Sequence, residues 1–266
     1  MPMKESFTAT QQKLQWDNTE LGTHVDAVAR GLVELGYKNG TKLAVWMTNE
    51  AEHLCLYFAA AKAGVVLVTL DPALSAAAVG KVLKDEGCRG LVFSERFGGR
   101  LREGDVQSLV PELGAGSWGD LVSSKAFRSL RHVISSGWEV ADGVTKFAEF
   151  PVYGSTDDIL PEVAGYLSDD DVLVVPYAAG GDVDTPVRGT PMNHDDLVDA
   201  ASKTASDLGL TAKDTLVVTS PLSSTGITDA LAATIVGAKV VLPSKEFNAD
   251  IAAKSVAKAK ATAFVG

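Results

Sequence analysis

The sequence has few cysteines and histidines. Only two cysteines and four histidines occur among 266 residues. Cys55 lies in an apolar run and Cys88 directly precedes one, without the spacing of a metal site or a redox motif. We therefore expect reduced, structural thiols. The histidines are scattered, at His24, His53, His132 and His194. No pair has metal-ligand spacing, so we predict no metal site.

Clustered positive charge and long apolar runs are also scarce. The net charge is −10, and no stripe of lysine and arginine could follow a nucleic-acid backbone, so we predict no nucleic-acid partner. The most apolar run, residues 54–70, is interrupted by Lys62 and Gly64 and is shorter than the roughly 20 residues of a membrane-spanning helix. We predict no transmembrane segment. The first 16 residues match neither a secretory signal nor a transit peptide.

Two catalytic fingerprints are missing. A serine hydrolase of the nucleophile-elbow type needs G-x-S-x-G, and a dinucleotide-binding fold needs G-x-G-x-x-G after a strand. Neither pattern occurs in the sequence. The acidic clusters, such as "SDDD" at 168–171, are interpreted as solvated surface or helix-start charges rather than as cation sites.

Apolar periodicity predicts strands alternating with helices. After a polar lead-in, helical spacing predicts helices over 21–35, 50–63, 75–87, 194–210, 228–238 and 250–260. Short apolar runs predict strands over 42–47, 65–70, 90–94, 131–135, 172–177, 215–220, 239–243 and 261–266. This alternation predicts an α/β fold with mostly parallel sheets. The pattern weakens from about 95 to 170, and we place a soft subdomain boundary near 150–170 within one domain over 1–266.

The stretch "YAAGGDVDTPVRG", Tyr177 to Gly189, has the outline of a phosphate-holding loop. A strand leads into a glycine turn, and a proline, a basic residue and a glycine precede a helix start. Glycines let consecutive backbone N–H groups converge on a phosphate, and a cation adds charge. The candidate nucleotide-binding residues are Gly180, Gly181, Thr185, Arg188 and Gly189.

Several segments resemble the AMP-forming acyl-CoA synthetases of the adenylate-forming superfamily, in particular its medium-chain fatty acyl-CoA ligase branch. They are "VARGLVELGYKNGTKLAVWMTNEAEHLCLYFAAAKAGVVLVTLDPAL" at 28–74, "GTPMNHDDLVDAA" at 189–201 and "GAKVVLP" at 237–243. The resemblance implies stacked, mostly parallel sheets with covering helices, as in part of the N-terminal domain of these enzymes. It also implies an ATP loop of the type "YTSGTTGxPKG" at 177–189.

The loop departs from this pattern. Ala178 and Ala179 replace hydroxyl residues, and Gly181 and Asp182 replace the threonine pair. Asp182 and Asp184 bring carboxylates towards a polyphosphate, and two unit charges about 4 Å apart repel by roughly 4 kcal/mol at an effective dielectric near 20. A Mg²⁺ ion bridging carboxylate and phosphate would reverse this effect. The sequence therefore predicts a phosphate loop that has lost its donors.

Two further departures concern the acyl pocket and the missing half of the family pattern. In "PLSSTG", residues 221–226, Ser223 and Ser224 replace an aromatic residue and a histidine, and we predict a polar turn with Ser or Thr as the N-cap. The resemblance places the adenine-contacting segment, the ribose-binding aspartate and the C-terminal domain with its catalytic lysine downstream of Gly266. We therefore expect a truncated domain without the C-terminal catalytic domain.

These departures predict a catalytically inactive, acyl-CoA-synthetase-like protein that is a structural or interaction subunit of a larger complex. We expect partner subunits or self-association through the edge near Ala261–Gly266, because apolar surface left uncovered usually marks an interface. No cofactor is expected. The alternative is a residual nucleotide, CoA or acyl binder, or a ligase half completed by another chain, and ATP with Mg²⁺ belongs only to it. The resemblance favours a mitochondrial location, with the cytoplasm as the alternative.

Overall fold

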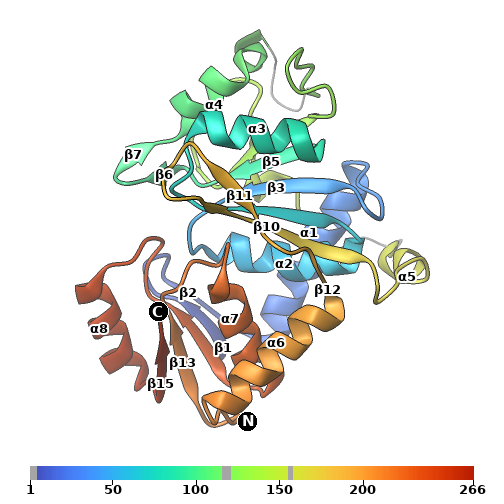
Figure 1. The fold of residues 1–266 in the computed structure, drawn as a ribbon. Helices are drawn as coiled ribbons and strands as arrows, with labels where there is room; N and C mark the ends of the chain where they lie inside the picture. Colours follow the sequence, from blue (N-terminus) through green and yellow to red (C-terminus); the bar gives the residue numbers. More distant parts are fainter. Residues whose placement is uncertain (1–4, 116–120, 155–157) are drawn as a thin grey trace.

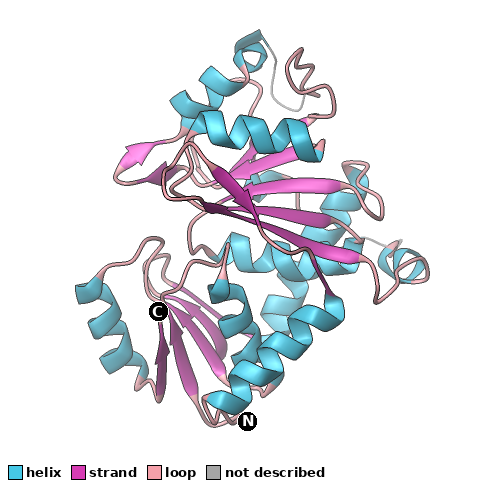
Figure 2. Cartoon of the chain, in the orientation of Figure 1, coloured by secondary structure: helices cyan, strands magenta, loops and turns pink. Residues whose placement is uncertain are grey.

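Two sheets separated by helices build the molecule (Figures 1 and 2). The structure is a computed structural model that describes residues 5–115, 121–154 and 158–266. Over these residues a five-stranded sheet has the order β15-β13-β14-β1-β2, which we call sheet A. An eight-stranded sheet, sheet B, has the order β11-β10-β4-β3-β5-β8-β9, with β12 also paired to β10. The predicted α/β class is confirmed.

Sheet B is parallel except at one edge. Its parallel strands are β10 (Val172–Ala179), β4 (Val66–Leu70), β3 (Lys42–Trp46), β5 (Gly90–Phe93), β8 (His132–Ser135) and β9 (Thr145–Lys146). The short strands β11 (Pro186–Arg188) and β12 (Met192–Asn193) run antiparallel to β10. All of β4 and most of β3 are buried, as expected for strands covered on both faces. The sheet is therefore central to the fold.

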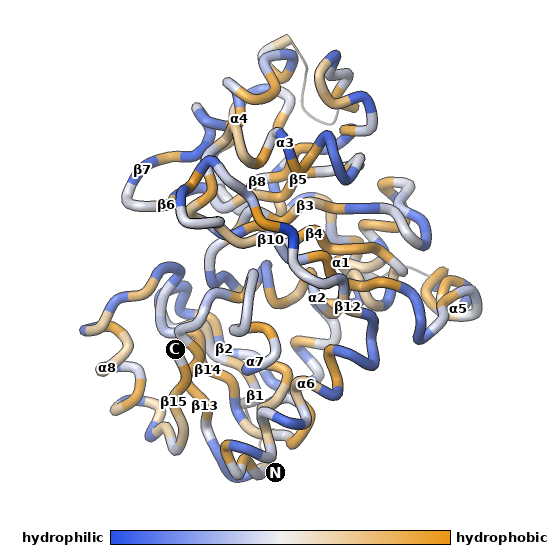
Figure 3. Tube along the Cα trace, in the orientation of Figure 1, coloured by the Kyte–Doolittle hydropathy of each residue, from blue (hydrophilic) through white to orange (hydrophobic). Residues whose placement is uncertain are grey.

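Two hydrophobic cores lie on opposite faces of sheet B. Leu43 and Val45 belong to one core, and Ala44 and Trp46 belong to the other, as the period of two in a strand requires. Helices α1 (Asn18–Glu34) and α2 (Ala51–Ala63) cover the face towards sheet A, and α3 (Ala76–Glu86) and α4 (Glu103–Leu109) cover the other (Figure 1). The apolar stretches of the chain gather along the strands of both sheets (Figure 3).

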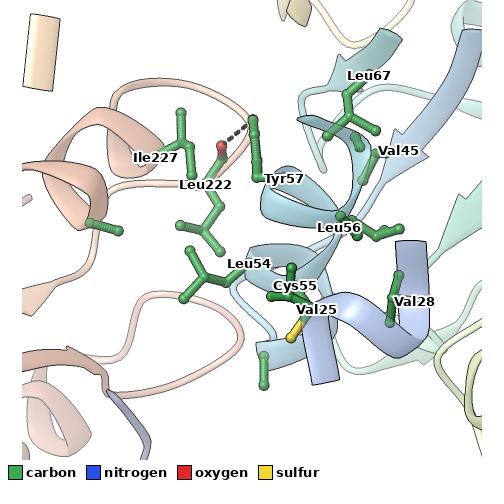
Figure 4. Close-up of a cluster of buried hydrophobic side chains, with 14 of the residues drawn as sticks. Val25, Val28, Val45, Leu54, Cys55, Leu56, Tyr57, Leu67, Leu222 and Ile227 are labelled. Atoms are coloured by element: carbon green, nitrogen blue, oxygen red, sulfur yellow. Dashed lines mark hydrogen bonds between the residues drawn. The ribbon is translucent and has the colours of Figure 1, made fainter. Parts of the chain in front are cut away.

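Helix α2 joins the two sheets. It is buried nearly all round and ends at Gly64, whose φ of +68° is the left-handed conformation that favours glycine. Side chains of α2 point towards Ile227, in the first turn of α7 (Thr225–Ile235), and towards Leu222, in the turn that precedes this helix (Figure 4). The Tyr57 hydroxyl donates a 2.8 Å hydrogen bond to the Leu222 carbonyl oxygen. The larger core is thus shared between the sheets.

Sheet A combines strands from both ends of the chain. Its strands are β1 (Glu5–Ala9), β2 (Leu14–Asp17), β13 (Thr215–Val218), β14 (Lys239–Leu242) and β15 (Ala263–Val265), and its helices are α6 (His194–Asp207), α7 and α8 (Ala249–Ala259). The interpretation of the first 20 residues as a polar lead-in was wrong, because β1 pairs in parallel with β14. Only Phe7 and Ala9 of β1 enter the core, so the local apolar pattern is weak, and the strand is held in place by its neighbours β2 and β14.

The middle of the chain is less regular. It contains the hairpin β6 (Arg96–Phe97) and β7 (Arg100–Leu101), 3-10 turns at Pro111–Ala115 and Phe147–Glu149, and the short helix α5 (Leu160–Ala164). The acidic connection after β9 includes residues 155–157, which lie outside the described ones. A subdomain boundary near 150–170 stays a prediction.

Candidate functional site

The candidate loop is the tip of the hairpin formed by β10 and β11. Tyr177 pairs with Arg188, and the Gly180 N–H donates a 2.8 Å hydrogen bond to the Thr185 carbonyl oxygen, which closes the tip. Gly181 has a φ of +96°, a conformation that glycine adopts readily. Three predicted residues, Gly180, Gly181 and Thr185, therefore lie together at the tip.

The other two predicted residues lie away from the tip. Arg188 is the last residue of β11, and Gly189 follows it. The Gly189 N–H donates a 2.8 Å hydrogen bond to the Pro176 carbonyl oxygen. This N–H group is therefore already used within the hairpin and is not aimed at the glycine turn.

An aspartate takes the donors of the tip. One carboxylate oxygen of Asp182 accepts the Asp184 N–H at 2.9 Å, and the other accepts the Thr185 hydroxyl at 3.1 Å. The hydrogen bonds from Thr185 and from the Asp184 backbone lower the pKa of Asp182. Asp182 thus occupies two donors of the tip, the Asp184 N–H and the Thr185 hydroxyl, and places a negative charge where an anionic phosphate would bind.

The tip is fastened to the start of α3. Ser75, the N-cap of α3, donates its N–H to the Val183 carbonyl oxygen at 2.9 Å. Its hydroxyl donates to an Asp184 carboxylate oxygen at 2.5 Å. The Lys81 ammonium group donates to the Asp184 carbonyl oxygen at 3.1 Å. These contacts fasten one side of the tip to the helix, while residues 180–185 stay exposed.

Arg188 is paired with a carboxylate on α3. Its Nε donates to Glu86 Oε1 at 2.7 Å, and the Tyr177 hydroxyl donates to the same oxygen at 2.8 Å. The Lys42 ammonium group donates to Glu86 Oε2 at 2.6 Å. Burial raises the pKa of Glu86, but the hydrogen bonds from Arg188, Lys42 and Tyr177 outweigh it and hold the pKa at about 2. The cation expected to bind phosphate is therefore neutralised by its own fold.

The position of Glu86 in the sequence contains one signal of its role. Glu86 is the last residue of α3, where the negative end of the helix dipole disfavours a carboxylate. A glutamate at that position suggests a cationic partner, although not which one. Its side chain is only 6% exposed, so an unpaired charge there would be costly.

The turn at 221–226 is held by Asn49, which follows strand β3 of sheet B. The Leu222 N–H donates to Asn49 Oδ1 at 2.8 Å, and Asn49 Nδ2 donates to the Ser220 carbonyl oxygen at 2.9 Å. Ser224 is the N-cap of α7, as predicted. Its hydroxyl, however, donates to the Pro221 carbonyl oxygen at 3.1 Å and accepts no backbone N–H. The polar turn is thus a junction between the sheets.

A buried carboxylate completes this junction. Glu50 has a side chain only 1% exposed, and it accepts hydrogen bonds from the hydroxyls of Thr48 and Ser94. The ammonium group of Lys245, which follows β14, donates to Glu50 Oε2 at 3.0 Å. Every donor in the cluster comes from a segment next to one of the two sheets. The "NE" pair, Asn49 and Glu50, therefore has a structural role that the sequence pattern did not reveal.

The cysteines, the possible metal ligands and the apolar helices offer no further candidate site among the residues that the structure describes. Cys55 and Cys88 are buried and unbridged, and burial raises the pKa of each thiol to about 12. Among residues 5–115, 121–154 and 158–266, His, Cys, Asp and Glu side chains form no group of three suited to a metal ion. In the same residues, no helix combines the length and the apolar character needed to cross a bilayer.

Residues 2–266 match the family described as AMP-binding enzyme. The chain belongs to the AMP-binding enzyme family. It is 26% identical over 276 residues to the rat protein named medium-chain acyl-CoA ligase ACSF2, mitochondrial, covering all of this chain and 44% of that one. It is 24% identical over 262 residues to the acyl-CoA ligase sidI of Aspergillus fumigatus, covering 95% and 42%.

The fold agrees with this family. The crystal structure of the N-terminal domain of FACL13 from Mycobacterium tuberculosis superposes with a TM-score of 0.75, at 18% identity, over 99% of this chain and 58% of that one. Stacked parallel-rich sheets with covering helices, as the resemblance implied, are therefore present in this member of the AMP-binding family. The chain spans less than half the length of the two ligases above.

Proposed function

We propose that this AMP-binding family member does not bind ATP at its phosphate loop, is catalytically inactive and acts as a structural or interaction subunit of a larger protein complex. The observation that carries the first part is the occupied loop. Asp182 takes the Asp184 N–H and the Thr185 hydroxyl, and Glu86 holds Arg188 at 2.7 Å. An incoming polyphosphate would have to displace one carboxylate and compete with another.

The interaction role rests on the edge of sheet A. In the described structure β15 is the outer strand and pairs with β13. Phe264 of this strand is 49% exposed, and Phe247, just before α8, is 70% exposed. Edge strands present unpaired backbone groups, and exposed aromatic residues beside them favour association. We infer that the segment near Ala261–Gly266 contacts another polypeptide or a second copy of the chain.

The loop is tested by ligand-dependent thermal stability. A ligand present at a hundred times its dissociation constant adds about 2.7 kcal/mol to the free energy of unfolding. We expect no stabilisation by ATP with Mg²⁺ or by an acyl-adenylate analogue. A rise in melting temperature that Arg188→Ala abolishes would contradict the proposal and support the alternative, a residual nucleotide, CoA or acyl binder or a ligase half completed by another chain.

The interaction role is tested separately by mass. We expect light scattering to show a native mass above that of one chain, or a partner to co-purify, and Phe264→Ser to release the single chain. Tyr166→Ser is a matched control, because Tyr166 is a 72% exposed aromatic residue that follows α5 and lies outside sheet A. A wild-type chain that is monomeric at all concentrations and has no partner would refute this part.

A mitochondrial location belongs to the same proposal. The support is that the rat, mouse and human relatives are named mitochondrial. Fractionation of cells that express the tagged protein tests it, and recovery in the cytoplasmic fraction alone would favour the alternative location.

A further inference from the structure

A pocket beside helix α1 is separate from the hairpin tip. It has a volume of about 260 Å³ and is lined by residues of β2, α1, the first turns of α2 and the segments 136–138 and 147–153. None of its described lining residues belongs to β10, to β11 or to the turn between them. A ligand in this pocket would therefore bind independently of the phosphate loop.

Aromatic side chains are concentrated around this pocket. Phe, Trp and Tyr make up 7% of the chain. Four of the thirteen described lining residues are of these types, namely Trp16, Trp138, Phe147 and Tyr153. Trp138 is 82% exposed, and Tyr153 is also exposed. Large aromatic residues that stay in water beside a concave surface usually mark a binding site. The pocket therefore offers aromatic rings that a ligand can reach.

Local structure builds one aromatic wall of the pocket. Asp17, the last residue of β2, caps α1, because its side chain accepts two backbone N–H groups of the first turn. This cap fixes the junction at which the rings of Trp16 and His24 meet, with their centroids 4.5 Å apart. The His24 Nδ1 atom and the Tyr153 hydroxyl share a 2.9 Å hydrogen bond. Contacts within the chain thus hold the wall in place, and such preorganisation reduces the cost of binding.

A single carboxylate lines the pocket. Glu52, in the first turn of α2, is partly exposed, and no lysine or arginine is among the described lining residues. The Gln12 amide donates a 2.7 Å hydrogen bond to Glu52 Oε2 and holds the side chain in place. Burial, and after it the charge of Glu50, raises the pKa of Glu52 above its ordinary value. Lys245 acts in the opposite direction but is bonded to Glu50 at 3.0 Å. A cation in the pocket would therefore stabilise the ionised Glu52.

We propose that this pocket binds a small organic cation, an alkylated ammonium ion. Aromatic rings attract such a cation through the negative charge of their faces, and the Glu52 carboxylate supplies the counter-charge. The largely apolar surface of the ion suits a pocket lined by rings and aliphatic side chains. An anion would meet the Glu52 charge, and a hard metal ion would find one carboxylate rather than several oxygen ligands among the described lining residues. The volume suits a small molecule, and the net charge of −10 favours cations at long range.

Calorimetric titration with choline at constant ionic strength tests the site. Its neutral analogue, in which a tert-butyl group replaces the trimethylammonium group, has nearly the same shape without the charge. We expect choline to bind saturably and the analogue to bind more weakly by about tenfold or more. Glu52→Gln and Trp138→Leu should each weaken the binding of choline by about fivefold or more.

Two features of the variants keep this test interpretable. Glu139→Gln is the matched control for charge, because Glu139 is exposed and follows Trp138 but is not among the described lining residues. This control should leave the affinity unchanged. Because the Trp138 side chain is so exposed, Trp138→Leu should keep the melting temperature of the wild type, and it tests the site even if Glu52→Gln folds poorly.

Four results would overturn the proposal. Choline that fails to bind saturably shows that the pocket is not an ammonium site. Equal binding of the neutral analogue shows an apolar pocket that does not recognise charge. An affinity that Glu52→Gln and Trp138→Leu both leave unchanged places the cation elsewhere on the protein. Equal weakening by Glu139→Gln shows a diffuse charge effect.

Discussion

Replacing Glu86 with glutamine removes one charge while keeping the size of the side chain. In the wild type this carboxylate accepts hydrogen bonds from Arg188, Lys42 and Tyr177. Removing one partner of a fully buried ion pair costs about 3–5 kcal/mol. Here the side chains of Lys42 and Arg188 are 34% and 46% exposed, so both cations can return to water. We expect Glu86→Gln to lower the free energy of unfolding by about 2 kcal/mol near neutral pH.

The pH dependence of this loss has a definite sign. The folded pKa of Glu86 is about 2, below the ordinary value of 4.5. A carboxylate with a depressed folded pKa stabilises the protein fully above its unfolded pKa, and this stabilisation disappears as the pH falls through the folded pKa. This pKa shift corresponds to a contribution of about 3 kcal/mol to the free energy of unfolding. Because solvent screens the exposed cations, we reduce this contribution to about 2 kcal/mol. The variant and the wild type should therefore converge between pH 4.5 and 2.

Urea unfolding at neutral pH and at several acidic values measures both effects. Glu34→Gln is the matched control, because Glu34 is also the last residue of a helix but is exposed. Glu34→Gln should leave the free energy of unfolding unchanged or raise it slightly, since a carboxylate is unfavourable at a helix C-terminus. An equal loss for Glu86→Gln at every pH would refute the reasoning, because the carboxylate charge would then not be its source.

Other predictions concern the core. In α1, Gly31→Ala places a Cβ 2.2 Å from the Phe150 carbonyl oxygen. We therefore expect thermal melting to show a free energy of unfolding lower by about 2–3 kcal/mol. Gly22→Ala on the same helix meets no atom within 4 Å and should raise the free energy of unfolding by up to about 1 kcal/mol. Tyr57→Phe leaves the buried Leu222 carbonyl without its donor and should cost about 1–2 kcal/mol in urea unfolding. Burial lowers the pKa of His53 to about 4, so the neutral ring stabilises the fold fully above about pH 6.5, and this stability is lost as the pH falls to 4. His53→Gln should therefore flatten the fall in melting temperature over that range, and an unchanged profile would contradict this assignment.

The sequence was sufficient to predict strands and helices that have a strong pattern within their own residues. The apolar run of β4 and the glycine after α2 identify a buried strand and a helix end without any knowledge of the rest of the chain. Strand β1 has only two core residues, Phe7 and Ala9, and its pairing with β14 depends on a segment far along the chain. Such a strand is stabilised by tertiary context, which sequence propensity does not contain.

The predicted glycine turn follows β10 in the structure. Of its contacts, the sequence indicated those between neighbouring residues but not those with α3. The effect of Asp182 was anticipated as repulsion of a phosphate. Its hydrogen bond to the Asp184 N–H, two residues on, is a local habit of aspartate in turns. The pairing of Arg188 with Glu86 joins residues 102 positions apart. No local pattern specifies such a pair, because it depends on how α3 packs beside β11.

The composition of sheet A has a consequence for how the chain folds during synthesis. Phe7 lies beside Val240 in the sheet, so β1 leaves the ribosome roughly 230 residues before β14, its parallel partner, or about 12 to 46 s earlier at ordinary elongation rates. The strands of sheet B are complete by β12, well before β14 is made. Until then β1 can pair only with β2, its antiparallel neighbour. A two-stranded hairpin alone is at best marginally stable in water, so we expect the β1–β2 segment to become stably ordered only after β14 is made.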